Sequence, residues 1–332
     1  MKILLRHLPR VIPCVLTLSA VTLSVITTPA HPQPAPYPSK PIRVVVPTPA
    51  GGPTDVLARI VGQKMTESWN QPVVVENRPG ADTIIGNSFV AKSAPDGYTL
   101  LVTVDAAVTM HQFVYKKLPY DPAKDFTPIA LVANSYVSII VNSSVPANSL
   151  AELIALGKAS PGKYTFGWGT LKPRLIVERL SGLAGVKFLD VPYKNSAPTA
   201  QALLAGDVSF VSDGLTAYKS NIGKGRFRLV AVTGTQRASA IPDVPTFQEL
   251  GYPGFDTGVW LGMFGPAGMS APMVEKINAE VTRILNIRDI RERVEGLGLE
   301  VLSRSPQQFA DLIRADADTW GPVIRGIGLT LD

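Results

Sequence analysis

Short apolar runs alternate with amphipathic segments of helical length along the first hundred residues. In the segment 54–68, for example, Leu57, Ile60 and Val61 fall on one helical face. The pattern predicts strands at 42–46, 72–76 and 98–104 and helices at 54–68 and 84–93. This alternation is typical of βαβ units around a mostly parallel sheet, so the fold class is α/β.

A second series of the same kind follows from about residue 136. It predicts helices at 149–159, 173–184, 197–205 and 215–222 and strands at 163–168, 186–191, 207–212 and 227–233. After it come a strand-like stretch at 255–268 and helices at 270–286, 287–297 and 305–325. Several helix starts carry capping-box pairs, such as Ser149 with Glu152 and Ser305 with Gln308.

The C-terminal helices need a sheet to cover, and a chain that returns to its first sheet provides one. We therefore assign 42–135 plus 236–332 to lobe 1 and 136–235 to lobe 2. Two crossings between the lobes leave a cleft at the carboxyl ends of the strands, where open α/β sheets bind ligands.

The N-terminus has the pattern of a secretory signal peptide at 1–30. A basic start is followed by an uncharged apolar stretch and by the small residues of Thr28-Pro29-Ala30. An uncleaved membrane anchor is the alternative, because about 20 apolar residues span a bilayer. The proline-rich segment 31–41 is predicted to be a linker, and the mature chain is expected in the periplasm.

Composition argues against several classes of protein. The chain has 332 residues, 45% of them hydrophobic, with 32 Lys and Arg against 26 Asp and Glu. Three of the basic residues, Lys2, Arg6 and Arg10, lie in the predicted signal. The small remaining excess argues against a nucleic-acid partner.

The sequence has few residues suited to catalysis or metal binding. The single cysteine, Cys14, falls inside the predicted signal, and His111 is the only histidine beyond the linker. No G-x-S-x-G or H-E-x-x-H motif is present. We therefore predict no enzyme, no cofactor and no metal site, and we expect His111 to be a partly exposed surface residue.

The stretch PTPAGGPTDVLAR joins the first strand to the first helix. Gly51 and Gly52 permit a positive φ or close approach of a ligand, and the N–H groups at the helix start, with the helix dipole, suit an anion such as a carboxylate. A tight turn without a ligand is the alternative. The spacing fits neither a P-loop nor a dinucleotide fingerprint, and Asp55 is expected to cap the helix or to pair with Arg59.

The chain also resembles a known family. The stretches YPSKPIRVVVPTPAGGPTDVLAR, QPVVVENRPGA, APDGYTLL, LPYDPAKDFTPI, VPYKNSAPTAQALLAGDV, LVAVTGTQRASAIPDVPTFQELGYPG and GMFGPAGMSAPMVEKINAEV are similar to the substrate-binding proteins of tripartite tricarboxylate transporters, the Bug family. The resemblance covers about residues 37–328.

This resemblance implies a periplasmic-binding-protein fold of type II, with two parallel-rich lobes closing over a small organic acid. Family members hold a carboxylate with backbone N–H groups and hydroxyls of lobe 1 loops. By position in this sequence, the resemblance assigns ligand contacts to Thr48, Ala50, Gly51, Gly52, Thr54, Asp55, Asp105 and Ala106.

In lobe 2 the chain departs from the family pattern. The stretch FGWGTLKPRL is shorter than its counterpart, with Trp168 in place of a serine and Arg174 in place of a histidine. If this loop faces the cleft, Trp168, Thr170 and Arg174 contact the ligand; otherwise Trp168 packs between the lobes and Arg174 points to solvent. Asp213 matches a family acid at the cleft, or is a turn residue.

Two further positions are open to interpretation. Thr48 stands where the family has an aromatic residue, and Asp82 adds a charge that we expect to cap a helix.

The resulting hypothesis is a monomeric solute receptor that captures a mono- or dicarboxylate and presents it to transporter subunits in trans. A ligand-dependent sensor that partners a membrane receptor kinase is the alternative, and an enzyme on this scaffold is the least favoured.

Overall fold

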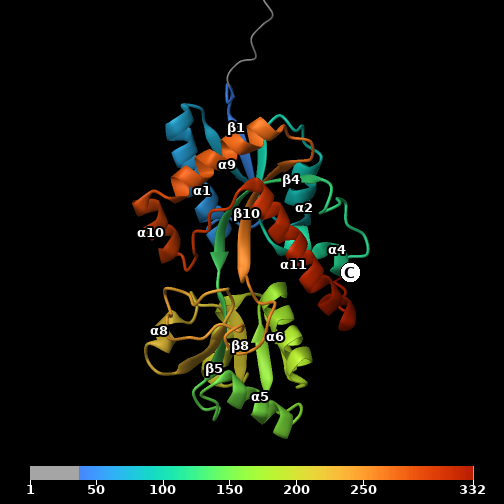
Figure 1. Ribbon diagram of the computed structural model, residues 1–332, viewed down its shortest axis with the longest axis vertical. Coiled ribbons are helices and arrows are strands. Elements are labelled where there is room, and N and C mark those ends of the chain that lie inside the picture. Colours follow the sequence, from blue (N-terminus) through green and yellow to red (C-terminus); the bar gives the residue numbers. More distant parts are fainter. Residues whose placement is uncertain (1–36, 332) are drawn as a thin grey trace, which may run out of the picture. The chain divides into compact units, whose positions relative to one another are not determined.

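The computed structural model describes residues 37–331, and its elements are shown in Figure 1. The predicted signal peptide and most of the predicted linker lie outside the described residues. Two five-stranded sheets carry the described part of the chain, each with helices packed against it.

The first sheet has the strand order β2-β1-β3-β10-β4. Its strands are β1 (Ile42–Val46), β2 (Val73–Asn77), β3 (Thr99–Val104), β4 (Phe126–Ser135) and β10 (Val259–Pro266). Strand β1 pairs in parallel with β2 and β3, whereas β10 is antiparallel to both of its neighbours. The accompanying helices are α1 (Pro53–Trp69), α2 (Ile84–Ala91), α3 (Ala106–Thr109), α4 (His111–Val114), α9 (Ala271–Leu285), α10 (Arg288–Gly296) and α11 (Pro306–Gly326).

The second sheet has the strand order β7-β6-β8-β5-β9. Its strands are β5 (Val137–Asn142), β6 (Thr165–Trp168), β7 (Leu189–Pro192), β8 (Phe210–Gly214) and β9 (Phe227–Val232). Its helices are α5 (Leu150–Ala159), α6 (Leu171–Ala184), α7 (Ser196–Ala205) and the short α8 (Lys219–Ile222). The predicted α/β class with two parallel-rich sheets is therefore confirmed.

Both sheets repeat one topology. In each, the first three strands of a βαβαβ series are parallel in the order second, first, third, and the next strand is antiparallel. Consequently β6 is the counterpart of β1, and α6 is the counterpart of α1.

The chain crosses between the sheets twice. Tyr136 alone separates β4 from β5, and the segment 233–258 leads from β9 back to β10. The lobe boundary at 236 stays a prediction. Beyond it, the N–H of Phe247 donates to Val232 O, and the N–H of Gly234 donates to Phe255 O, so part of the segment 236–258 is bonded to the end of β9.

Helix α11 connects the two halves of the core. Near its start, Phe309 packs against Trp260 and Phe264 of β10. Near its end, Trp320 packs against Phe255 and belongs to the core cluster that contains the inner face of α6. Figure 1 shows α11 running from the first sheet toward α6. Its predicted capping box at Ser305 and Gln308 is confirmed.

Candidate functional site

The carboxyl ends of β1, β3, β6 and β8 meet at the boundary between the sheets. Strand β5 begins at this boundary and pairs with β8 through Val137 and Gly214, which places the end of β8 there. Strand β10 also begins there, and its pairing of Leu261 with Val104 places the end of β3. Because β1 is parallel to β3 and β6 to β8, the loops after all four strands lie at this boundary.

The loop after β1 forms a turn that only glycine adopts without strain. Gly51 has φ +86°, and Gly52, in an extended conformation, is the N-cap that precedes α1. The N–H group of Gly51 donates a hydrogen bond of 2.8 Å to the Asp55 carboxylate. One of the donors predicted for the ligand is therefore occupied by a side chain of the same loop.

Asp55 organises this loop from inside. Its carboxylate is buried and lies 2.9 Å from Arg59 Nη2, which confirms the predicted ion pair, and it also accepts a hydrogen bond from Asn77. Burial alone would raise the pKa of Asp55, but the hydrogen bonds from Arg59, Gly51 and Asn77 outweigh it, so its pKa lies below the usual range.

Replacement of Asp55 by Asn should give a pH-dependent loss of stability. A carboxyl group whose pKa is lowered in the folded state stabilises the fold above its unfolded pKa of about 3.9, and this contribution is lost as pH falls through the folded pKa. Urea unfolding should show Asp55→Asn less stable by roughly 1–2 kcal/mol at pH 7, with the difference shrinking below about pH 4.

The exposed Asp318→Asn on α11 is the matched control and should show no such trend. If the difference in unfolding free energy between wild type and Asp55→Asn stayed constant down to about pH 2, the lowered pKa of Asp55 would be contradicted.

The start of α1 retains donors for an anion. In any helix the first N–H groups have no intrahelical acceptor, and at α1 these belong to Gly52, Thr54 and Asp55, since Pro53 has no N–H. Ala50 and Gly51 are exposed. Thr48 Oγ1 has no hydrogen-bond partner among the described residues. The loop thus combines backbone donors, a hydroxyl and the positive end of a 17-residue helix.

In the loop after β3, the Asp105 side chain is bonded within the protein. Asp105 is 1% exposed, and its Oδ1 accepts the N–H of Ala106 at 2.8 Å. Its Oδ2 lies 2.7 Å from Nζ of Lys172, the second residue of α6. Both carboxylate oxygens of Asp105 therefore already have partners, one of them from the opposite sheet.

Lys172 is a functional candidate that the sequence interpretation missed. It is 2% exposed and also bonds to Asp316 of α11 at 2.9 Å and to Thr257 at 3.2 Å. Burial alone would lower the pKa of Lys172, but the two adjacent carboxylates raise it above the ordinary value, so the ammonium is charged. Its position three residues before Leu175 and four before Ile176, on the buried face of α6, is the signal that could have identified it.

Asp213 at the end of β8 is also bonded internally. It accepts hydrogen bonds from Ser196 at 2.9 Å and from Tyr218 at 2.8 Å, and its backbone neighbour Gly214 donates a third. Burial raises the pKa of Asp213 against the effect of these bonds. Its carboxylate joins the start of α7 to Tyr218, the residue before α8.

Trp168 and Arg174 share a partner on β7. Trp168 Nε1 donates to Asp190 at 3.2 Å, and Arg174 Nη2 lies 3.2 Å from the same carboxylate. The Arg174 guanidinium also lies 5.0 Å from the centre of a Trp168 ring, a cation–π contact. Thr170, which begins α6, is exposed and its side chain makes no capping bond.

Two expectations near α2 were wrong. His111 is 1% exposed rather than partly exposed, because its ring packs against Tyr115 and lies within 3.2 Å of the Tyr120 hydroxyl. Asp82 does not cap a helix; its carboxylate lies 3.4 Å from His111 Nε2 and accepts a bond from Tyr115.

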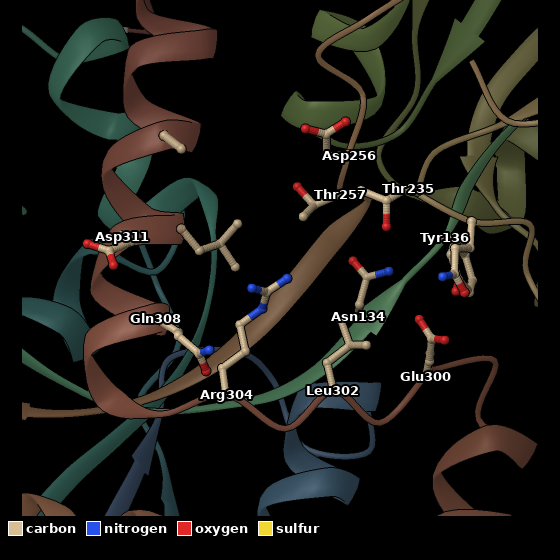
Figure 2. A pocket seen from close by; sticks show the side chains of 14 residues that line it. Asn134, Tyr136, Thr235, Asp256, Thr257, Glu300, Leu302, Arg304, Gln308 and Asp311 are labelled. Carbon is tan, nitrogen blue, oxygen red and sulfur yellow. The ribbon is translucent and has the colours of Figure 1, made fainter. Parts of the chain in front are cut away.

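A polar cavity of about 660 Å³ lies beside the two crossing segments (Figure 2). Asn134 and Thr257 are buried in its wall, and Arg304, Glu300 and Asp256 bring charges to it. None of the predicted ligand residues lines this cavity.

The described residues contain neither a metal-binding cluster nor a membrane-spanning helix. No cluster of three or more His, Cys, Asp or Glu side chains suited to a metal ion occurs in residues 37–331. Over the same range, every helix is too short or too polar to cross a bilayer.

The chain matches known proteins over nearly its whole described length. The family model of the tripartite tricarboxylate transporter family receptor matches residues 57–329. Protein BugT of Bordetella pertussis is 33% identical over 298 residues, which cover 89% of this chain and 91% of BugT.

Solved structures of similar proteins also match nearly the whole described length of the chain. The Rhodopseudomonas palustris protein Rpa4515, solved with adipate, is 32% identical with a TM-score of 0.74, over 89% of this chain and 99% of that one. MatC from the same organism, solved with bound malate, is 32% identical with a TM-score of 0.70, over 87% and 100%. The chain therefore belongs to the tripartite tricarboxylate transporter receptor family, whose members are periplasmic solute-binding receptors of this two-sheet fold and not enzymes.

Proposed function

We propose that this chain captures a small mono- or dicarboxylate in the periplasm and presents it to the membrane subunits of a tripartite tricarboxylate-type transporter. The observation that carries the proposal is the start of α1, where the N–H groups of Gly52 and Thr54 have no intrahelical acceptor and the hydroxyl of Thr48, in the same loop, is unbonded. The relatives solved with adipate and malate support a carboxylate as the class of ligand.

In this proposal one carboxylate of the solute binds at the start of α1, in the field of the helix dipole. Asp55 and Asp105 act by fixing their loops, since their oxygens are already bonded within the protein. Thr170 and Trp168 approach the solute from the second sheet when the two lobes close. The chain acts as a monomer, and closure over the solute produces the form that the transporter receives.

Thermal unfolding with a panel of organic acids tests the ligand class. A ligand that binds only the folded chain stabilises it by about 2.7 kcal/mol at a hundred times its Kd, so at least one mono- or dicarboxylate, such as adipate or malate, should raise Tm by several degrees in a saturable manner. The corresponding amides and alcohols are the matched control and should give no shift.

The panel requires protein from which any co-purified solute has been removed. An absence of any shift across the whole panel would refute a carboxylate receptor. A shift produced equally by the amides would refute the anion site at α1.

A further inference from the structure

Lys172 extends from α6 across the boundary to elements of the first sheet. Its Nζ lies 2.7 Å from Asp105 Oδ2, 2.9 Å from Asp316 Oδ2 and 3.2 Å from Thr257 Oγ1. An ammonium group has three N–H donors, and here each has an acceptor. Lys172 therefore has no donor left for a solute while this arrangement holds.

The acceptors of Lys172 are themselves fixed. Asp316 Oδ2 also accepts the indole N–H of Trp260 at 2.6 Å, and its Oδ1 lies 3.2 Å from the Thr257 hydroxyl. Asp105 is bonded to Ala106. Each member of this network, Asp105, Lys172, Thr257, Trp260 and Asp316, is 7% exposed or less.

The network lies where the chain crosses between the sheets. Thr257 belongs to the second crossing segment, one residue before Gly258, whose Cα lies so close to the first crossing that a Cβ would meet Ser135 O at 1.9 Å. Figure 2 shows Thr257 and Thr235 of the second crossing and Tyr136 of the first crossing around the same cavity. The hydrogen bond from Lys172 to Thr257 therefore ties α6 to the segment where the chain crosses between the sheets.

The other end of the lysine is at the proposed solute site. Thr170 is the N-cap that precedes α6 and Lys172 is the second residue of the helix, so the position of Lys172 fixes the first turn of α6 and the loop before it. Buried ion pairs add little net stability, but breaking one leaves an uncompensated buried charge. An orientation of α6 that separated Lys172 from Asp105 and Asp316 is therefore disfavoured.

We propose that Lys172 is a positioning residue for solute binding, which holds the start of α6 in register with the loop after β3. The effect on affinity rests on the proposed function, whereas the effect on the arrangement of the lobes does not. Without the ammonium, the buried carboxyl groups of Asp105 and Asp316 lose their counter-charge, and a movement of α6 away from the first sheet admits water that solvates them.

The test combines a distance between the lobes with an affinity. Spin labels are placed on Gln63→Cys of α1 and Ala155→Cys of α5, both exposed, in protein that starts at residue 31 and so lacks Cys14. Lys172→Met should broaden the distance distribution without solute and weaken binding of adipate or malate at least tenfold. Adding Asp316→Asn, which removes one of the two carboxylates, should narrow the distance distribution and restore part of the affinity.

Two further variants serve as references. Lys224→Met, at an exposed lysine of the second lobe, should leave both measurements unchanged. Lys172→Gln keeps one donor group and should broaden the distance distribution less than Lys172→Met does. It replaces Lys172→Met if that variant does not fold.

A wild-type distance distribution in folded Lys172→Met or Lys172→Gln would overturn the proposal, whether or not affinity falls, because a loss of affinity alone would make Lys172 a direct contact. If the wild type binds no acid of the panel, the proposed function fails, and the distance distribution still decides the role of Lys172.

Discussion

Replacement of Gly258 by Ala is expected to destabilise the protein by more than about 3 kcal/mol, beyond the usual cost of an overpacked site. A Cβ at this position would lie 1.9 Å from the Ser135 carbonyl oxygen and 2.9 Å from its carbon, so the clash is with backbone that no side-chain rotation relieves. The two crossing segments would have to separate, which disturbs β4 and β10 together. Thermal unfolding should show Tm lowered by roughly 10 °C.

Gly182→Ala on α6 is the matched control for this clash. A Cβ at Gly182 meets no atom within 4 Å, and Ala is favoured over Gly within a helix by up to about 1 kcal/mol. We expect this variant to be as stable as the wild type or more stable. A Gly258→Ala protein with unchanged Tm would show that the crossings are not held in this contact.

Replacement of Gly52 by Leu should abolish solute binding while the protein stays folded. The Gly52 backbone has φ −75° and ψ 165°, which any residue adopts, and a Cβ there would lie 3.7 Å from Pro49 O, an ordinary contact. The remaining Leu atoms would then occupy the space before the N–H groups of α1. Calorimetry with the tightest acid of the panel should show Kd raised at least about a hundredfold, equivalent to about 2.7 kcal/mol.

Gly182→Leu introduces the same side chain at an exposed helical position and should bind like the wild type. Wild-type affinity in Gly52→Leu would show that the solute does not bind at the start of α1. A loss of binding explained by a lowered Tm would also count against this site.

Much of the fold could be predicted because most elements have clear periodicity and punctuation. Strand β1 coincides with the predicted 42–46, and α5, α9 and α11 agree within a residue at each end. In contrast, β4 and β5 were not predicted. They are buried on both faces for most of their length and separated by Tyr136 alone, so neither alternation nor a turn signal marks them. Helix α8 forms only at Lys219–Ile222, shorter than the predicted 215–222.

The candidate site was less predictable because its chemistry depends on distant partners. The loop at Gly51 and Gly52 could be recognised from its local sequence, as could the pairing of Asp55 with Arg59 four residues later. The bonds of Lys172 join residues 67 and 144 positions away, and no local pattern specifies such pairs. His111 was misjudged for the same reason, since its partner Asp82 lies on another loop.

A crystal structure of the chain with the tightest-binding acid of the panel would test the proposed site most directly. We predict one carboxylate of the acid within hydrogen-bond distance of the N–H groups of Gly52 and Thr54, at the start of α1. An acid bound instead in the cavity beside the crossing segments, among Asn134 and Arg304, with the α1 start empty, would contradict the account.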